Sequence, residues 1–215
     1  MPKAPMRIAE AKALKRLVID GKILDVGGDP KSKYHTLIGG EHHITFANIS
    51  EHYRPDIVFD AQEPWPVASG TYDAILMFNF LEHVFEHRAV LAEAFKALAP
   101  GGRLVGTVPF MFNVHGSPSD YFRYTEFALR KLFKLSRLEV CRLETMGTGA
   151  FYVAWAAIQG PLPEPLAVVG RSLAIGLDRL LATIKPGNKL GHQFYPIGYF
   201  FEVRRSQDGD RQAAT

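Results

Sequence analysis

The sequence is poor in cysteine: Cys141 is the only one among its 215 residues. A single cysteine excludes an intrachain disulfide and a cysteine-rich metal site. It is also typical of proteins from a reducing compartment, and on this ground we expect a cytoplasmic protein.

The sequence also lacks an unbroken apolar run. The longest apolar stretch, 166–184, contains Arg171, Asp178 and Arg179, and these charges argue against a spanning helix. Residues 1–20 are basic but lack the apolar core of a signal peptide. The net charge is only +3 and the basic residues are scattered. We therefore expect no transmembrane segment and no nucleic-acid partner.

What the first half of the sequence contains is an alternation of strand and helix patterns. A helix at 86–99 has its apolar residues on one face, and Pro100-Gly101-Gly102 is expected to end it. Such alternation predicts a mostly parallel sheet with helices on both faces, which binds ligands at the carboxyl ends of its strands. The predicted strands are 22–26, 44–49, 56–60, 72–78 and 103–108.

The second half of the chain departs from this alternation. We expect strands near 138–145 and 197–204 to form a final antiparallel hairpin, with a helical insertion at 146–195 inside a single domain of residues 1–215. The apolar face of this insertion suits a lid over the active site, a homodimer contact, a membrane-surface contact or core packing. The remaining predicted helices are 126–133, 151–158 and 166–184.

A short glycine-containing loop, Asp25-Val-Gly27-Gly28-Asp29, follows the first predicted strand. Glycines there let a ligand approach the backbone closely, although two glycines after a strand can also form a plain turn. The loop lacks the G-x-G-x-x-G spacing of dinucleotide-binding proteins. This absence argues against a nicotinamide-dependent oxidoreductase.

The order of the segments after this loop is more specific. The chain resembles the class I S-adenosylmethionine-dependent methyltransferases, in particular the group often called type 11. The resemblance implies a Rossmann-like sheet of seven strands, S-adenosylmethionine as cofactor, and methyl transfer to an oxygen or nitrogen of a small-molecule substrate. Five segments carry it: Ile23-Leu-Asp-Val-Gly-Gly28, Asp60-Ala-Gln-Glu-Pro-Trp-Pro66, Gly70-Thr-Tyr-Asp-Ala-Ile75, Phe80-Leu-Glu-His-Val84 and Leu98-Ala-Pro-Gly-Gly-Arg-Leu104.

The resemblance further implies that the cofactor lies at the ends of the first four strands. The glycine-containing loop would contact its methionine part, the end of the second strand its ribose, and the segment after the third strand its adenine. At the ribose position Asn48 replaces the more usual acid, and an amide accepts a weaker hydrogen bond. The cofactor-binding residues so implied are Asp25, Gly27, Gly28, Asn48, Ile49, Asp60, Ala61, Phe78, Asn79 and Phe80.

The segment 115–124 follows the fifth predicted strand and is rich in polar and aromatic residues. We expect His115 to act as a catalytic base or a substrate contact, because a neutral imidazole accepts a proton readily near pH 7. Tyr121, Arg123 and Tyr124 are expected to contact the substrate. In the alternative, Asp120 and Arg123 pair to hold the loop, and the aromatic residues pack beneath it.

Two further alternatives concern metal binding and catalysis. His83 and His87 have the i, i+4 spacing of metal ligands on a helix, but acids and histidines here also suit the start of a helix. We expect that no metal takes part.

A second alternative concerns catalysis. Asn48 in place of the usual acid, together with the few glycines of the first loop, would also suit a catalytically silent relative that acts through binding.

Overall fold

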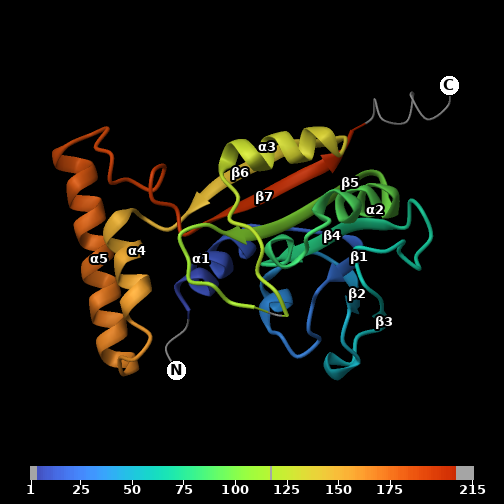
Figure 1. Ribbon diagram of the computed structural model, residues 1–215, viewed down its shortest axis with the longest axis horizontal. Helices are drawn as coiled ribbons and strands as arrows, with labels where there is room; N and C mark the ends of the chain where they lie inside the picture. The colour runs from blue at the N-terminus through green and yellow to red at the C-terminus, as the bar shows by residue number, and fades with distance from the viewer. Residues whose placement is uncertain (1–3, 117, 207–215) are drawn as a thin grey trace.

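The computed structural model describes residues 4–116 and 118–206, and a seven-stranded sheet forms its centre (Figure 1). The strand order is β3-β2-β1-β4-β5-β7-β6; β1 to β5 run parallel, and β7 lies antiparallel between β5 and β6. This confirms the predicted fold class and its final antiparallel pair. The strands are β1 Gly21–Val26, β2 His42–Asn48, β3 Ile57–Val58, β4 Tyr72–Phe78, β5 Leu98–Pro109, β6 Leu138–Met146 and β7 Gly198–Arg205.

Helices cover both faces of the sheet, as the alternating pattern predicted. On one face, Leu91 of α2 and Phe133 of α3 pack into a core that includes Met77 of β4. On the other, Leu14 of α1 packs with Leu76, the preceding residue of β4. Successive residues of a strand point to opposite faces, so a strand buried on both sides reads as a continuous apolar run. The helices are α1 Pro5–Leu14, α2 His87–Ala97, α3 Glu126–Leu135, α4 Ala150–Ile158 and α5 Glu164–Ile184, with short 3-10 turns η1 Tyr34–Leu37, η2 Glu51–Tyr53 and η3 Leu81–His83.

The junction between α2 and β5 differs from the prediction. The helix ends at Ala97 and the strand begins at Leu98, so Pro100-Gly101-Gly102 lies inside β5 rather than between two elements. Leu98 pairs with Tyr72, and the register of β4 and β5 then shifts before Ala74. The Pro-Gly-Gly sequence is thus accommodated as an irregularity of a paired strand, a position in which both residue types are tolerated.

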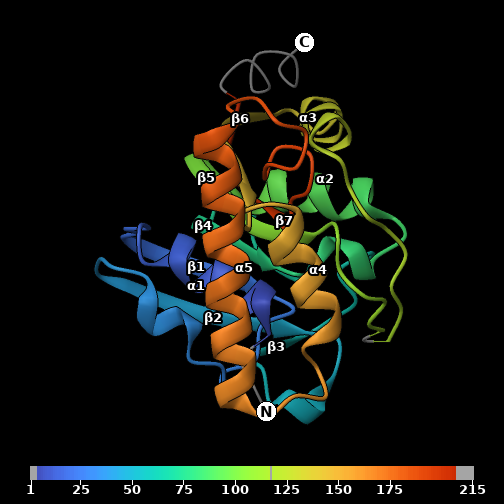
Figure 2. The same ribbon diagram turned by 90° about the vertical axis from the view of Figure 1, so that its left-hand side faces the viewer.

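Helices α4 and α5 lie between β6 and β7 in the chain and pack against each other beyond one end of the sheet (Figure 1). Viewed from that end, α5 stands in front with α4 beside it (Figure 2). The apolar stripe of α5 faces solvent, which excludes core packing for these side chains in this single chain. Its exposed residues are Leu166, Val169, Leu173, Leu177, Leu180 and Ile184. Across the described ranges, no helix is both long and apolar enough to span a bilayer.

A buried acid joins the two helices. Asp178 of α5 accepts hydrogen bonds from the hydroxyl of Thr148 at 2.7 Å and from the backbone amides of Phe151 and Tyr152 at 3.1 Å each. The first turn of a helix has amides without intrahelical partners, and here a side chain from another helix satisfies two of them. Asp178 therefore fixes where α4 begins relative to α5.

Replacing Asp178 by alanine should lower the free energy of unfolding by about 2–4 kcal/mol, because the buried amides of α4 lose a charged acceptor. The change is measured by urea denaturation, and hydrogen exchange at Phe151 and Tyr152 should accelerate. Glu164→Ala, at an exposed position of the same helix, is the matched control. Unchanged exchange at both amides in Asp178→Ala would show that α4 does not depend on this acid.

Candidate active site

The carboxyl ends of β1, β2, β4 and β5 meet at one edge of the sheet because these strands are parallel neighbours. Every residue that the sequence analysis assigned to the cofactor or the substrate lies near one of these ends, in the segment that follows one, or after the neighbouring β3. Parallel α/β sheets bind their ligands at this edge. The edge is therefore the candidate active site.

The glycine-containing loop after β1 is shaped around Asp25. The Asp25 carboxylate is 1% exposed and accepts a hydrogen bond from the Tyr34 hydroxyl. A side chain at Gly28 would collide with this carboxylate, and one at Gly27, where φ is +80°, would lie 2.6 Å from the Phe80 ring. Burial, with a further contribution from the nearby Glu10, raises the pKa of Asp25 to about 7.

The end of β2 is tied to the same loop through Asn48. Its side-chain Nδ2 donates to the carbonyl of Gly28 at 3.1 Å, and its Oδ1 accepts from the amide of Ser50 at 3.0 Å. A carboxylate at this position could not donate to a carbonyl oxygen. The amide that replaces the usual acid therefore has a structural task of its own, which the sequence did not indicate.

The segments after β2 and β3 complete the predicted cofactor side. Ile49 is exposed at the end of β2. Asp60 accepts from the amide of Gln62 through Oδ1, while Ala61 is buried and its carbonyl accepts from the Trp65 indole at 2.9 Å. The backbone around Asp60 is thus held in place by its own turn and by a buried tryptophan.

Glu10 of α1 also reaches this edge, and no pattern in the sequence marked it. Its carboxylate is 2% exposed and accepts from Asn79 Nδ2 at 2.5 Å, from Thr107 Oγ1 at 3.0 Å and from Arg7 at 2.8 Å. Asn79 has φ of +49°, and its buried Oδ1 has no hydrogen-bond partner among the described residues. An acid in a basic N-terminal helix looks like any solvated residue until the helix is placed against the sheet.

The segment after β5 is fixed to η3, the turn that follows β4. The amide of Tyr121 donates to the carbonyl of Glu82 at 2.7 Å, and the Tyr124 hydroxyl donates to the carbonyl of Leu81 at 3.0 Å. Tyr124 is 5% exposed, which gives it a packing role beneath the loop, whereas Tyr121 is half exposed.

Asp120 and Arg123 pair with each other inside this loop. Arg123 donates to both carboxylate oxygens of Asp120, at 2.5 and 2.7 Å, and also to the carbonyls of Phe122 and Asn113. The Arg123 guanidinium lowers the pKa of Asp120 to about 2. Both terminal nitrogens of Arg123 are engaged within the loop, so the pair holds the loop as the alternative interpretation proposed.

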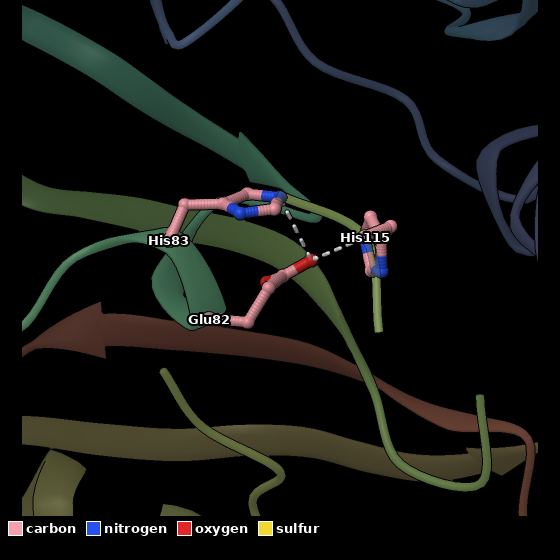
Figure 3. Close-up of side chains that lie close together, drawn as sticks. All are labelled: Glu82, His83 and His115. Carbon is pink, nitrogen blue, oxygen red and sulfur yellow. Dashed lines mark ion pairs between the residues drawn. The ribbon is translucent and has the colours of Figure 1, made fainter. Parts of the chain in front are cut away.

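A buried acid and two histidines come together where this loop meets η3 (Figure 3). Nε2 of His83 and Nε2 of His115 each lie 3.7 Å from Oε1 of Glu82. Glu82 is fully buried, and His115 is the more exposed of the two imidazoles. The nearby carboxylate of Glu82 is the largest cause that raises the pKa of His115. His87 is not part of this group; its Nδ1 lies 3.4 Å from the Tyr124 hydroxyl.

Comparison with protein families finds one model that covers most of the chain. Residues 5–143 match the family described as "Methyltransferase domain". No curated protein sequence matches the chain.

Solved structures with the same fold are numerous, and three illustrate its range. An S-adenosylmethionine-dependent methyltransferase from Mesorhizobium loti is 15% identical, with a TM-score of 0.59 over 92% of this chain and 98% of that one. Geranyl diphosphate C-methyltransferase from Streptomyces coelicolor A3(2), in complex with Mg²⁺, geranyl diphosphate and S-adenosyl-L-homocysteine, is 13% identical, with a TM-score of 0.58 over 93% and 80%. The [4+2]-cyclase SpnF is 18% identical, with a TM-score of 0.57 over 94% and 81%. At these identities the likeness concerns the fold alone.

The buried carboxylate of Asp25 generates a prediction about pH. Its folded-state pKa of about 7 lies above the ordinary 3.8, so the stability it contributes is fully present below pH 3.8 and is lost as the pH rises through about 7. Asp25→Asn, which cannot ionise, should therefore have a free energy of unfolding about 1–4 kcal/mol higher than the wild type above pH 7, measured by urea denaturation. Near pH 4 the two proteins should unfold together. A constant difference at both pH values would contradict the raised pKa; Glu51→Gln, at an exposed position, is the control.

Proposed function

The chain belongs to a methyltransferase-domain family of the class I S-adenosylmethionine-dependent enzymes, and we propose that it methylates an oxygen or nitrogen of a small-molecule acceptor. The enzyme class and the cofactor follow from the family. The acceptor is proposed from the group of Glu82, His83 and His115, which lies beside the cofactor edge and joins a proton-accepting side chain to a buried negative charge.

The residues at the edge fit the cofactor that the family uses. Asp25 and Asn79 Oδ1, which has no hydrogen-bond partner among the described residues, are buried acceptors beside Gly27 and Gly28, where a side chain would collide. They suit the ammonium group of the methionine part. Asp60 Oδ1 caps its own turn, and its carboxylate suits the amino group of adenine. When bound, S-adenosylmethionine supplies a methyl group on a positively charged sulfur that is already activated for transfer.

The proposed role of His115 is to accept the proton that the acceptor loses. Nδ1 of His115 lies 3.1 Å from the carbonyl oxygen of Asn113, which can only accept, so Nδ1 carries the hydrogen and Nε2 holds the lone pair. Nε2 faces Glu82, whose negative charge stabilises the imidazole once it is protonated. As the acceptor oxygen or nitrogen received the methyl group, His115 would hold the proton that this atom gives up.

Exposed aromatic side chains beside this loop support a small organic acceptor. Phe85 and Tyr121 are 58% and 50% exposed, and their rings meet edge to face with centroids 5.5 Å apart. Solvent-exposed rings at the mouth of a site offer an apolar surface to a substrate. We propose that Tyr121 contacts the acceptor, while Arg123 and Tyr124 act by holding the loop.

The first prediction concerns the cofactor. Asp60→Ala should weaken the binding of S-adenosylhomocysteine by about 1.5–3 kcal/mol, because a charge-assisted hydrogen bond is lost. Isothermal titration calorimetry measures the change. Asp60→Asn, which retains an oxygen that can cap the turn at Gln62, separates loss of the charge from loss of the turn. Wild-type affinity in both variants would place the adenine elsewhere.

The second prediction concerns His115. His115→Ala should lower kcat by roughly a hundredfold or more, the scale expected for loss of a general base, while the affinity for S-adenosylhomocysteine stays unchanged. The acceptor for this assay is found by screening phenols, sugars and amines with radiolabelled cofactor. Full turnover in the variant would mean that alignment of the reactants alone drives transfer. A loss of affinity for S-adenosylhomocysteine in the variant would assign the loop to the cofactor site instead.

A further inference from the structure

We propose that Glu82, His83 and His115 bind a divalent transition-metal ion, with zinc as the best match, at the acceptor side of the active site. The proposal rests on the proposed function only in assigning this side of the edge to the acceptor. It departs from our expectation that no metal takes part, which rested on interpreting His83 and His87 as part of a helix start. The ligand set is different: His115, from a separate loop, takes the place that His87 would have had.

Both imidazoles are oriented as metal ligands are. Nδ1 of His83 lies 2.6 Å from the carbonyl oxygen of Ser119, and Nδ1 of His115 lies 3.1 Å from that of Asn113. A carbonyl oxygen cannot donate, so in each ring Nδ1 carries the hydrogen and the lone pair is on Nε2. Metal-ligating histidines are characteristically held in this way, by a carbonyl on the nitrogen remote from the metal.

The third ligand is a carboxylate from the turn η3. Glu82 is fully buried, and neither of its side-chain oxygens has a hydrogen-bond partner among the described residues. Isolating an ionised carboxylate from water costs several kcal/mol unless a positive charge compensates it. The Nε2 atoms of both histidines lie 3.7 Å from one of these oxygens, Oε1. Two lone pairs and a buried carboxylate that converge within 4.8 Å of one another form a site for a cation.

The separations suit a shared metal better than direct hydrogen bonds. Each Nε2 lies 3.7 Å from Glu82 Oε1, and the three ligand atoms lie within 4.8 Å of one another. A hydrogen bond between nitrogen and oxygen would span about 2.7–3.2 Å. Two ligands at about 2.0–2.2 Å from one tetrahedral zinc lie roughly 3.3–3.6 Å apart. Small adjustments of the side chains would therefore close the site on an ion.

The backbone that carries the ligands is fixed before any ion binds. The amide of Tyr121 donates to the carbonyl of Glu82, and the amide of His115 donates to Asp120 at 2.8 Å. Asp120 is in turn held by both terminal nitrogens of Arg123. This network gives the Asp120 and Arg123 pair a purpose beyond loop stability, since it positions His115 opposite η3.

Two imidazoles and one carboxylate favour zinc or a similar transition metal over magnesium, which prefers oxygen ligands. Three protein ligands leave a fourth position open, the arrangement of catalytic zinc sites. His115, with a third of its side chain exposed, lies on the open side. An acceptor hydroxyl in the open position would lose its proton to water more readily, and its oxygen would then attack the methyl carbon as the carbon–sulfur bond breaks. His115 acts in this form as a ligand, and in the metal-free form as the proton acceptor.

The test uses the full chain after dialysis against a chelator. Zn²⁺ is titrated by calorimetry, and Co²⁺ by the visible absorption that distinguishes tetrahedral from aqueous cobalt. We expect one ion per chain. His115→Ala and Glu82→Gln should each weaken Zn²⁺ binding by roughly a hundredfold, the upper end of the effect known for groups that support a metal site. His87→Gln, a histidine outside the ligand set, should bind Zn²⁺ as the wild type does.

Two results would overturn the metal site: no binding of either ion to the folded wild type, or binding that survives in both His115→Ala and Glu82→Gln. Loss of binding in His87→Gln alone would equally reject the ligand set. Because Glu82 is buried, the circular dichroism of its variant is checked, and the more exposed His115→Ala carries the test if Glu82→Gln does not fold. S-adenosylhomocysteine is titrated into the same samples. If S-adenosylhomocysteine does not bind, the proposed function is contradicted. If S-adenosylhomocysteine binds but Zn²⁺ does not, only the metal site is rejected.

Discussion

Buried negative charge is the constraint around which this active site is built. Glu10, Asp25 and Glu82 are each at most 2% exposed, and all three lie at the carboxyl edge of the sheet. An ionised carboxylate in such a place needs a proton, a hydrogen-bond donor or a cation. Glu10 has three donors, Asp25 has one and a raised pKa, and Glu82 has none among the described residues. The two acids that remain under-compensated mark the cofactor side and the acceptor side, where positively charged ligands are proposed to bind.

The second organising feature is the attachment of one loop to one turn. The segment after β5 is joined to η3 through the backbone of Glu82, the hydroxyl of Tyr124 and the imidazole of His83. Since β4 and β5 are parallel neighbours, the segments that follow them begin side by side. The sheet brings the two segments together, the hydrogen bonds lock them, and the Asp120–Arg123 pair sets the conformation of the loop between. Rigid support of this kind is what a reacting group requires.

The helical pair between β6 and β7 shows the same use of a buried acid at a place remote from the site. Asp178 of α5 accepts hydrogen bonds from the first amides of α4 and thereby joins the two helices. The result is a long helix whose apolar stripe is left facing solvent. An exposed apolar stripe suits a lid over the active site, a homodimer contact or a membrane-surface contact, the three roles that the sequence had left open besides core packing.

Consecutive residues determined much of this protein by themselves. The apolar runs define the strands, and the order of five short segments identifies the family and its cofactor. The pairing of Asp120 with Arg123 was one of the two interpretations that the segment 115–124 allowed. What only the tertiary structure decided are contacts between residues far apart in the chain: Glu10 with Asn79 and Thr107, and Glu82 with His115. A histidine or an acid has no periodicity that reveals its partner, because its energy depends on burial and on the charges that the fold brings to it. The sheet had to be assembled before His115 acquired the buried carboxylate that defines its chemistry.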